Sequence, residues 1–116
     1  MKILIAGGQG FTDKAMMQEA LSDYEDKVTC VISGRAKGAD TLGEQWGSSV
    51  GALTDPYPAL WEKYGRAAGP IRNQQMLDEG QPDLVVVFPG GPGSKSMVRK
   101  ARKAGVDVMT PGWVVT

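Results

Sequence analysis

The chain of 116 residues contains no histidine and only one cysteine, Cys30. Because histidine and cysteine clusters are the usual ligands of zinc and related metals, we expect no metal site. A single cysteine cannot form an internal disulfide, so we expect the protein to work in the reducing cytoplasm. Cys30 lies in the apolar run 28–32, where a small buried core residue is a simpler interpretation than a nucleophile.

The chain also lacks net charge, since its 13 basic and 13 acidic residues cancel. This balance supplies no general attraction to nucleic acid. No stretch is as long as a membrane-spanning helix, and the apolar start, residues 1–6, is too short for a signal peptide. We therefore expect neither a membrane nor a nucleic acid among its partners.

Glycine, in contrast, is abundant, with 16 residues, and 41% of the chain is hydrophobic. The length suits one domain, residues 1–116. Apolar runs alternate with helical patterns: strands are expected at 2–6, 28–32, 52–57, 83–88 and 106–109, and helices at 12–24, 39–50, 59–64, 71–79 and 94–103. This alternation predicts an α/β fold, a Rossmann-like three-layer sandwich in which helices cover both faces of a mostly parallel sheet of about five strands.

Some residues predict where these elements begin and end. Pro70 suits the first position of a helix that follows a loop at 66–70. Ser94 is a suitable N-cap for the basic helix that runs to residue 103. In the tail, Trp113 and Val114 are candidates to pack on the core.

Three glycine-rich turns each follow a predicted strand: the first turn (residues 7–10), the second turn (residues 33–40) and the third turn (residues 88–94). In a parallel sheet, ligands bind outside the carboxyl ends of the strands, and all three turns lie on that edge. Glycine allows backbone to approach a ligand closely, and free N–H groups at a helix start attract phosphate. Each turn alone has a structural alternative, a tight turn needed for geometry, but together they predict an anion site.

The second turn carries the most specific pattern, because two glycines bracket two cations before a carboxylate. Arg35, with its planar fork, and Lys37, as a point charge, are candidates to hold a phosphate. Asp40 is a candidate to accept a hydrogen bond from a ribose hydroxyl. Its structural alternative is a first-turn carboxylate that supports the helix dipole.

Residues 61–73 form another dense patch. Aromatic residues beside arginines suit a nucleobase and its phosphates. For Trp61 we favour the structural interpretation, in which it pins a long loop to the core. For Arg72, which with Asn73 is expected at a helix N-terminus where anions collect, we favour ligand binding. The basic run 95–103 is interpreted as a solvated helix face.

The second turn resembles the serine-glycine-x-alanine-x-glycine-x-aspartate signature of the DNA-processing (Smf/DprA) proteins. Residues 89–94 resemble the PGGxGT signature of the Lonely-Guy nucleotide hydrolases. Both belong to the SLOG superfamily of Rossmann-like domains. Over nearly its full length, residues 65–76 included, the chain looks like the small YspA/cpYpsA-related branch, which is common in bacteria and their phages. The resemblance implies nucleotides or nucleotide-derived ligands at the glycine turns, and a homo-oligomer.

The Lonely-Guy hydrolases carry a glutamate three residues after the threonine of their signature. Here Ser94 takes the threonine place and Met97 the glutamate place, and methionine cannot act as a general base. The resemblance therefore favours a binding module without a further cofactor: a sensor, carrier or sequestering protein for a nucleoside phosphate or an NAD- or ADP-ribose-like ligand. The alternative is a nucleoside 5′-monophosphate N-glycosidase that uses Arg72 with Asp40 or Glu62. A third hypothesis, DNA binding by analogy, is disfavoured by the zero net charge.

The predicted ligand-binding set gathers the glycine turns and the polar residues beside them: Gly8, Gln9, Gly34, Arg35, Lys37, Asp40, Arg72, Asn73, Gly90, Gly91, Gly93 and Ser94. The candidate catalytic residues of the alternative are Arg72, Asp40 and Glu62. Replacing either Arg35 or Arg72 by alanine is expected to weaken binding by about 1.5–3 kcal/mol, the scale of hydrogen bonds to charged groups.

Overall fold

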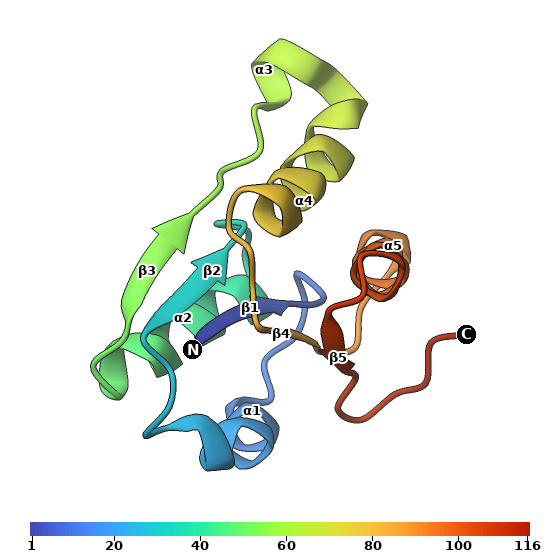
Figure 1. Ribbon diagram of the computed structural model, residues 1–116. Coiled ribbons are helices and arrows are strands. Elements are labelled where there is room, and N and C mark those ends of the chain that lie inside the picture. Colours follow the sequence, from blue (N-terminus) through green and yellow to red (C-terminus); the bar gives the residue numbers. More distant parts are fainter.

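The computed structural model describes all 116 residues, and five parallel strands form its single sheet in the order β3-β2-β1-β4-β5 (Figure 1). The strands are β1 (Lys2–Ala6), β2 (Cys30–Ser33), β3 (Leu53–Pro56), β4 (Leu84–Val87) and β5 (Asp107–Met109). The predicted α/β fold is confirmed, and the sheet is parallel throughout.

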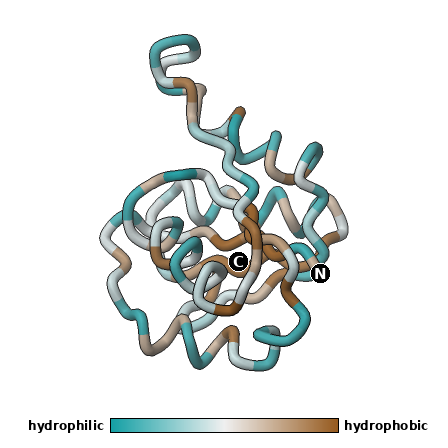
Figure 2. The backbone as a smooth tube through the Cα atoms, turned by 90° about the vertical axis from the view of Figure 1, so that its left-hand side faces the viewer, coloured by the Kyte–Doolittle hydropathy of each residue, from teal (hydrophilic) through white to brown (hydrophobic).

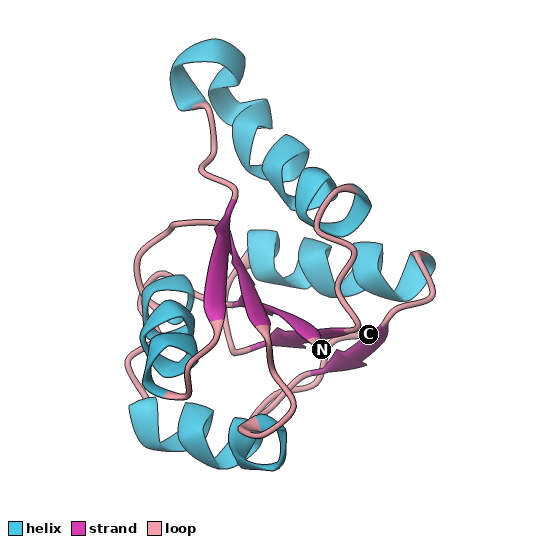
Figure 3. Cartoon of the chain, turned by 60° about the vertical axis from the view of Figure 1, so that its left-hand side comes forward, coloured by secondary structure: helices cyan, strands magenta, loops and turns pink.

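Helices cover both faces of the sheet (Figure 3). They are α1 (Lys14–Leu21), α2 (Ala39–Ser49), α3 (Trp61–Tyr64), α4 (Ala68–Asp78) and α5 (Pro92–Lys103), with 3-10 turns at Ser22–Tyr24 and Gly65–Ala67. One buried cluster joins α1 and α2 to the sheet, and a second cluster joins α4 and α5 to its other face. No helix combines the length and the apolar character needed to cross a membrane.

The central strands are apolar on both sides because each side meets a helix layer. In β1, Ile3 and Ile5 belong to the cluster with α1 and α2, whereas Leu4 and Ala6 belong to the cluster with α4 and α5. Continuous apolar runs are what a parallel strand buried on both faces requires. The most hydrophobic segments accordingly gather at the centre of the body (Figure 2).

Residues 57–67, which we call the arm, connect β3 to α4 and project from the body (Figure 1). The arm contains α3 and exposes three large apolar side chains: Leu60, Trp61 and Tyr64 are 49%, 57% and 38% exposed. The prediction that Trp61 is pinned to the core is therefore wrong. The arm follows the carboxyl end of β3, so it begins at the same sheet edge as the glycine turns.

The predicted loop at 66–70 is also wrong, because the chain there is already helical: a 3-10 turn covers Gly65–Ala67 and α4 begins at Ala68. Pro70 is the third residue of α4, not the first position of the helix as predicted. A proline is tolerated there because the N–H groups of the first turn have no intrahelical acceptor. The residue before proline normally avoids helical geometry, and here it is Gly69, which has no Cβ to clash.

Two further details differ from the sequence-based expectations. Helix α5 begins at Pro92 with Gly91 as its N-cap, so Ser94 lies inside the first turn and does not cap it. Proline has a backbone conformation that suits the first helical position, so the helix begins at Pro92, two residues earlier than expected. In the tail, Val114 is 86% exposed and Val115 is buried instead, while the Trp113 Nε1–H donates to the Val87 carbonyl at 2.9 Å.

Candidate functional site

The three glycine turns meet at the carboxyl edge of the sheet, and Gly8 joins them. Its N–H donates to the Pro89 carbonyl in the third turn at 3.1 Å. Its carbonyl accepts the N–H of Ala39, the first residue of α2, at 3.2 Å. The predicted convergence of the turns on one edge is thus observed as direct backbone contact.

Backbone packing at this junction leaves no room for side chains at two positions. Gly38 has a φ of +75°, and a Cβ there would overlap the Gly8 carbonyl oxygen. A Cβ at Gly90 would lie 2.6 Å from the Gly8 nitrogen. The second and third turns can therefore pack against the first turn only if positions 38 and 90 are glycine.

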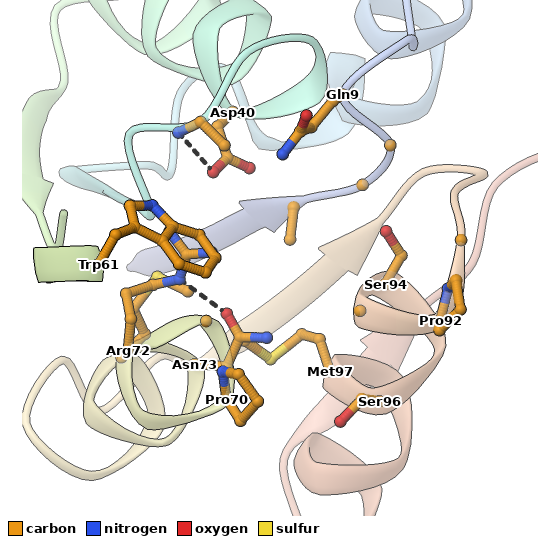
Figure 4. Close-up of a pocket in the computed structure, with 18 residues that line it drawn as sticks. Gln9, Asp40, Trp61, Pro70, Arg72, Asn73, Pro92, Ser94, Ser96 and Met97 are labelled. Carbon is orange, nitrogen blue, oxygen red and sulfur yellow. Dashed lines mark hydrogen bonds between the residues drawn. The ribbon is translucent and has the colours of Figure 1, made fainter. Parts of the chain in front are cut away.

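A pocket of about 320 Å³ opens at this edge, between the first turn, the start of α2, the arm, α4 and the start of α5 (Figure 4). Eight of the predicted ligand-binding residues line it: Gly8, Gln9, Asp40, Arg72, Asn73, Gly91, Gly93 and Ser94. They come from segments far apart in the chain, so the fold assembles most of the predicted set around one cavity.

The other four predicted residues, Gly34, Arg35, Lys37 and Gly90, lie outside the pocket lining. Gly34 is buried, and Gly90 lies at the junction with the first turn. Arg35 and Lys37 are exposed. Glu62, the alternative carboxylate, is exposed on the arm and is also absent from the lining.

Arg35 is held away from the pocket by a local network. Its φ of 61° is unusual for a residue with a side chain, and its N–H donates to Ser33 Oγ at 3.2 Å. Its Nε lies 3.5 Å from Glu44 Oε1, and Ser33 Oγ donates to Glu44 Oε2 at 2.8 Å. These contacts explain the conformation of Arg35 without a ligand.

Arg72, in contrast, lines the pocket and is half-buried. The sequence predicted Arg72 at a helix N-terminus, and this prediction is wrong, because Arg72 is the fifth residue of α4. Its Nη1–H donates to the Gly34 carbonyl and its Nε–H donates to Asn73 Oδ1 at 2.9 Å. A guanidinium has five N–H groups, so three remain available to a ligand.

Asp40 is the one carboxylate in the lining and is only 6% exposed. Burial raises the pKa of Asp40 to about 6, although the Ala36 N–H, which donates to Oδ2 at 3.1 Å, and the charge of Arg72 oppose this rise. Burial also lowers the pKa of Arg72, and the charge of Asp40 opposes that shift. The pocket thus contains a carboxyl group that changes charge close to neutral pH.

The start of α5 presents backbone donors to the same pocket. No side chain caps α5 and no acidic residue lies in its first turn. Its first intrahelical hydrogen bond runs from the Lys95 N–H to the Gly91 carbonyl at 3.1 Å, and Pro92 has no N–H. The N–H groups of Gly93 and Ser94 therefore have no acceptor within the helix, and both residues line the pocket.

Sequence reasoning missed several lining residues. Trp61 forms one end of the pocket in Figure 4, and Pro70, Met76, Ser96 and Met97 add to its walls. Met76 and Met97 are almost fully buried. The only signal for Trp61 was its place beside arginines in an aromatic patch, which equally fitted a core residue.

A parallel sheet of order 3-2-1-4-5 with a pocket at its carboxyl edge defines a Rossmann-like α/β protein. The model of the YspA, cpYpsA-related SLOG family matches residues 1–64. The Gene 61 protein of Mycobacterium phage D29 is 30% identical over 121 residues, which cover 96% of each chain. The chain therefore belongs to the YspA, cpYpsA-related SLOG family, and a phage encodes one of its relatives.

The fold is also similar to a larger solved structure. The X-ray structure of DNA processing protein A (DprA) from Streptococcus pneumoniae superposes with a TM-score of 0.76 over 98% of this chain, at 19% sequence identity. The match covers 51% of that chain, so this protein spans about half of its length. At this identity the likeness establishes the fold alone.

Proposed function

We propose that this protein binds a small, phosphate-bearing, nucleotide-like ligand in the pocket at the carboxyl edge of its sheet. The observation that carries the proposal is that one cavity receives both the uncapped start of α5 and the free donors of Arg72. These two donor groups come from different helices, and a nucleotide-like ligand has acceptors on its phosphate and on its other polar parts that can use both.

The phosphate end of the ligand belongs at α5. The N–H groups of Gly93 and Ser94 supply hydrogen bonds, and the helix dipole adds partial positive charge. Arg72 enters the same pocket from α4, and its positive charge adds to the attraction of an anionic ligand. The absence of an acidic residue from the first turn of α5 leaves this end free of local repulsion.

The rest of the pocket suits a sugar. Asp40, Asn73 and Gln9 line it and offer acceptors and donors for hydroxyl groups. Met76 and Met97 contribute apolar walls. Small-molecule sites commonly combine apolar walls with a few placed polar groups.

The lining favours binding over catalysis. Asp40 and Arg72 are its only titratable residues, so a pair of carboxyl groups for acid–base chemistry is missing. Met97 lines the pocket at the position where the Lonely-Guy signature places a glutamate. We therefore infer a sensor, carrier or sequestering protein.

A thermal-shift screen tests the proposal, with nucleoside monophosphates, NAD and ADP-ribose as ligands and mass spectrometry of each mixture afterwards. A ligand at 100 times its Kd stabilises the folded state by about 2.7 kcal/mol. We expect a shift with at least one of these compounds, recovered intact. If none shifts the transition at millimolar concentration, the proposal fails.

One observation favours a second candidate, a nucleotide N-glycosidase. A buried carboxyl group whose pKa is about 6 is poised for general acid–base catalysis, and Asp40 is such a group inside the pocket. In that reaction water adds to C1′, the glycosidic bond breaks and the base leaves with a proton. Free base that accumulates with the wild type but not with Asp40→Asn would establish this activity.

A further inference from the structure

Trp61 is the one tryptophan that this protein keeps open to solvent. Trp46 is 5% exposed, and Trp113 is half-buried with its Nε1–H bonded to the Val87 carbonyl. Trp61 is 57% exposed, yet it lines the pocket. An indole held beside a cavity with much of its surface free is available to a ligand.

Contact with the start of α4 positions the Trp61 indole. Its Cη2 atom lies 3.5 Å from the point where Gly69 would carry a Cβ, so the ring edge rests on backbone at the start of α4. Gly69 and Pro70 line the pocket next to it. The edge contact positions the ring without covering it.

Trp61 and the N–H groups at the start of α5 lie at opposite ends of the same pocket. In Figure 4 the indole lies at one end, near Arg72, and Ser94 lies at the other, with Asp40 and Gln9 along one side between them. A nucleotide has the same order of parts: an aromatic ring, a sugar with hydroxyl groups and a phosphate. The cavity of about 320 Å³ is at the lower limit of ligand sites, roughly 300–1,000 Å³, which suits one nucleotide better than two.

We propose that Trp61 is the stacking platform for the base of a single nucleotide, and that it makes this pocket select nucleotides over sugar phosphates. This inference rests on the proposed function, because it assumes that phosphate binds at the start of α5. The π-face of an indole accepts any nucleobase, so stacking selects the presence of a base rather than its identity.

Calorimetric titration separates base stacking on Trp61 from phosphate binding at α5 when it compares nucleotides with a sugar phosphate that has no base. The probes are AMP, GMP, CMP, UMP and ribose 5-phosphate, and the proteins are the wild type, Trp61→Ala and Trp61→Phe. Leu60→Ala is the matched control, because Leu60 is a neighbouring exposed apolar residue of the arm that does not line the pocket.

We expect the wild type to bind its best nucleotide about 5- to 150-fold more tightly than ribose 5-phosphate, the range that base–aromatic stacking supplies. Trp61→Ala should remove most of this ratio and leave the affinity for ribose 5-phosphate unchanged. Trp61→Phe should retain much of it, and Leu60→Ala all of it. Quenching of tryptophan emission by the nucleotide should disappear in Trp61→Phe.

Four outcomes overturn the inference. If the wild type binds ribose 5-phosphate as well as any nucleotide, or if Trp61→Ala weakens both equally, Trp61 is not a base platform, although the phosphate site stands. If Trp61→Ala only dissociates an oligomer in sedimentation equilibrium and the ratio is kept, Trp61 is an interface residue. If no probe binds the wild type, the proposed function fails as well.

Discussion

Helices α2 and α5 begin in the same way and yet present different surfaces to the pocket. Each follows a glycine-rich turn at the end of a central strand, and neither has a side-chain N-cap. The first turn of α2 carries Asp40, a buried carboxyl group, whereas the first turn of α5 has no acidic residue. A glycine turn before a helix is therefore not enough to identify a phosphate site, because one acidic side chain changes what the helix start attracts.

The comparison requires that the starts of both helices pack on the first turn. Gly38→Ala should disrupt this packing, and we expect it to have the largest effect on stability. A Cβ there overlaps the Gly8 carbonyl oxygen, and the φ of +75° is strained for alanine. Together these effects should lower the free energy of unfolding by about 2–4 kcal/mol.

Urea denaturation measures this loss, and Gly10→Ala is the control because nothing lies within 4 Å of its Cβ position. That variant should match the wild type or gain up to about 1 kcal/mol from a less flexible unfolded chain. Equal stability of Gly38→Ala and the wild type would show that the turns are not packed as described.

The carboxyl group at the start of α2 should make stability depend on pH. Because folding raises the pKa of Asp40 from 3.8 to about 6, its contribution is fully present below pH 4 and is lost as pH rises through 6. The loss is about 3 kcal/mol, since a pKa difference of one corresponds to about 1.4 kcal/mol. Asp40→Asn stays neutral and should not show this loss.

Urea denaturation of both proteins between pH 4 and pH 8 measures the difference. The gap between the wild type and Asp40→Asn should shift in favour of the variant as pH rises, and should level off above pH 7. Parallel curves would mean that Asp40 titrates near its ordinary pKa and that the start of α2 is negatively charged at neutral pH.

The two arginines sharpen the comparison at the level of binding. Arg72→Ala should weaken AMP binding by about 1.5–3 kcal/mol, because it removes a charged donor from the pocket. Arg35→Ala, which removes an exposed cation already paired with Glu44, should change it by no more than about 0.5 kcal/mol. Titration calorimetry of the two variants decides between the pocket, which Arg72 lines, and the exposed side of the second turn, which carries Arg35. The reverse order of effects would place the ligand at Arg35, outside the pocket.

The strand–helix alternation was enough to predict the fold and the edge where the turns meet. Buried parallel strands are continuous apolar runs, so β1 and β4 are recognisable from residue type alone. The carboxyl ends of parallel strands share one edge, so the meeting of the turns follows from topology. These predictions depend on the backbone path and not on side-chain direction.

Side-chain direction explains most of what could not be predicted. The pattern of the second turn does not show that Arg35 adopts a positive φ and pairs with Glu44 in the following helix α2. Nor does it show that Arg72 reaches the second turn from α4 to bond the Gly34 carbonyl. Trp61 was misplaced for the same reason, since whether an aromatic residue faces the core or a pocket depends on how the arm leaves the sheet.

The most direct test of the central claim is a 15N–1H correlation spectrum of the protein titrated with AMP. If phosphate binds at the start of α5, the largest amide shifts should appear at Gly91, Gly93 and Ser94, with smaller ones at Asp40 and Thr41. Shifts that centre on residues 35–41, or that are spread evenly over the surface, would contradict the account and return the anion site to the second turn or remove it altogether.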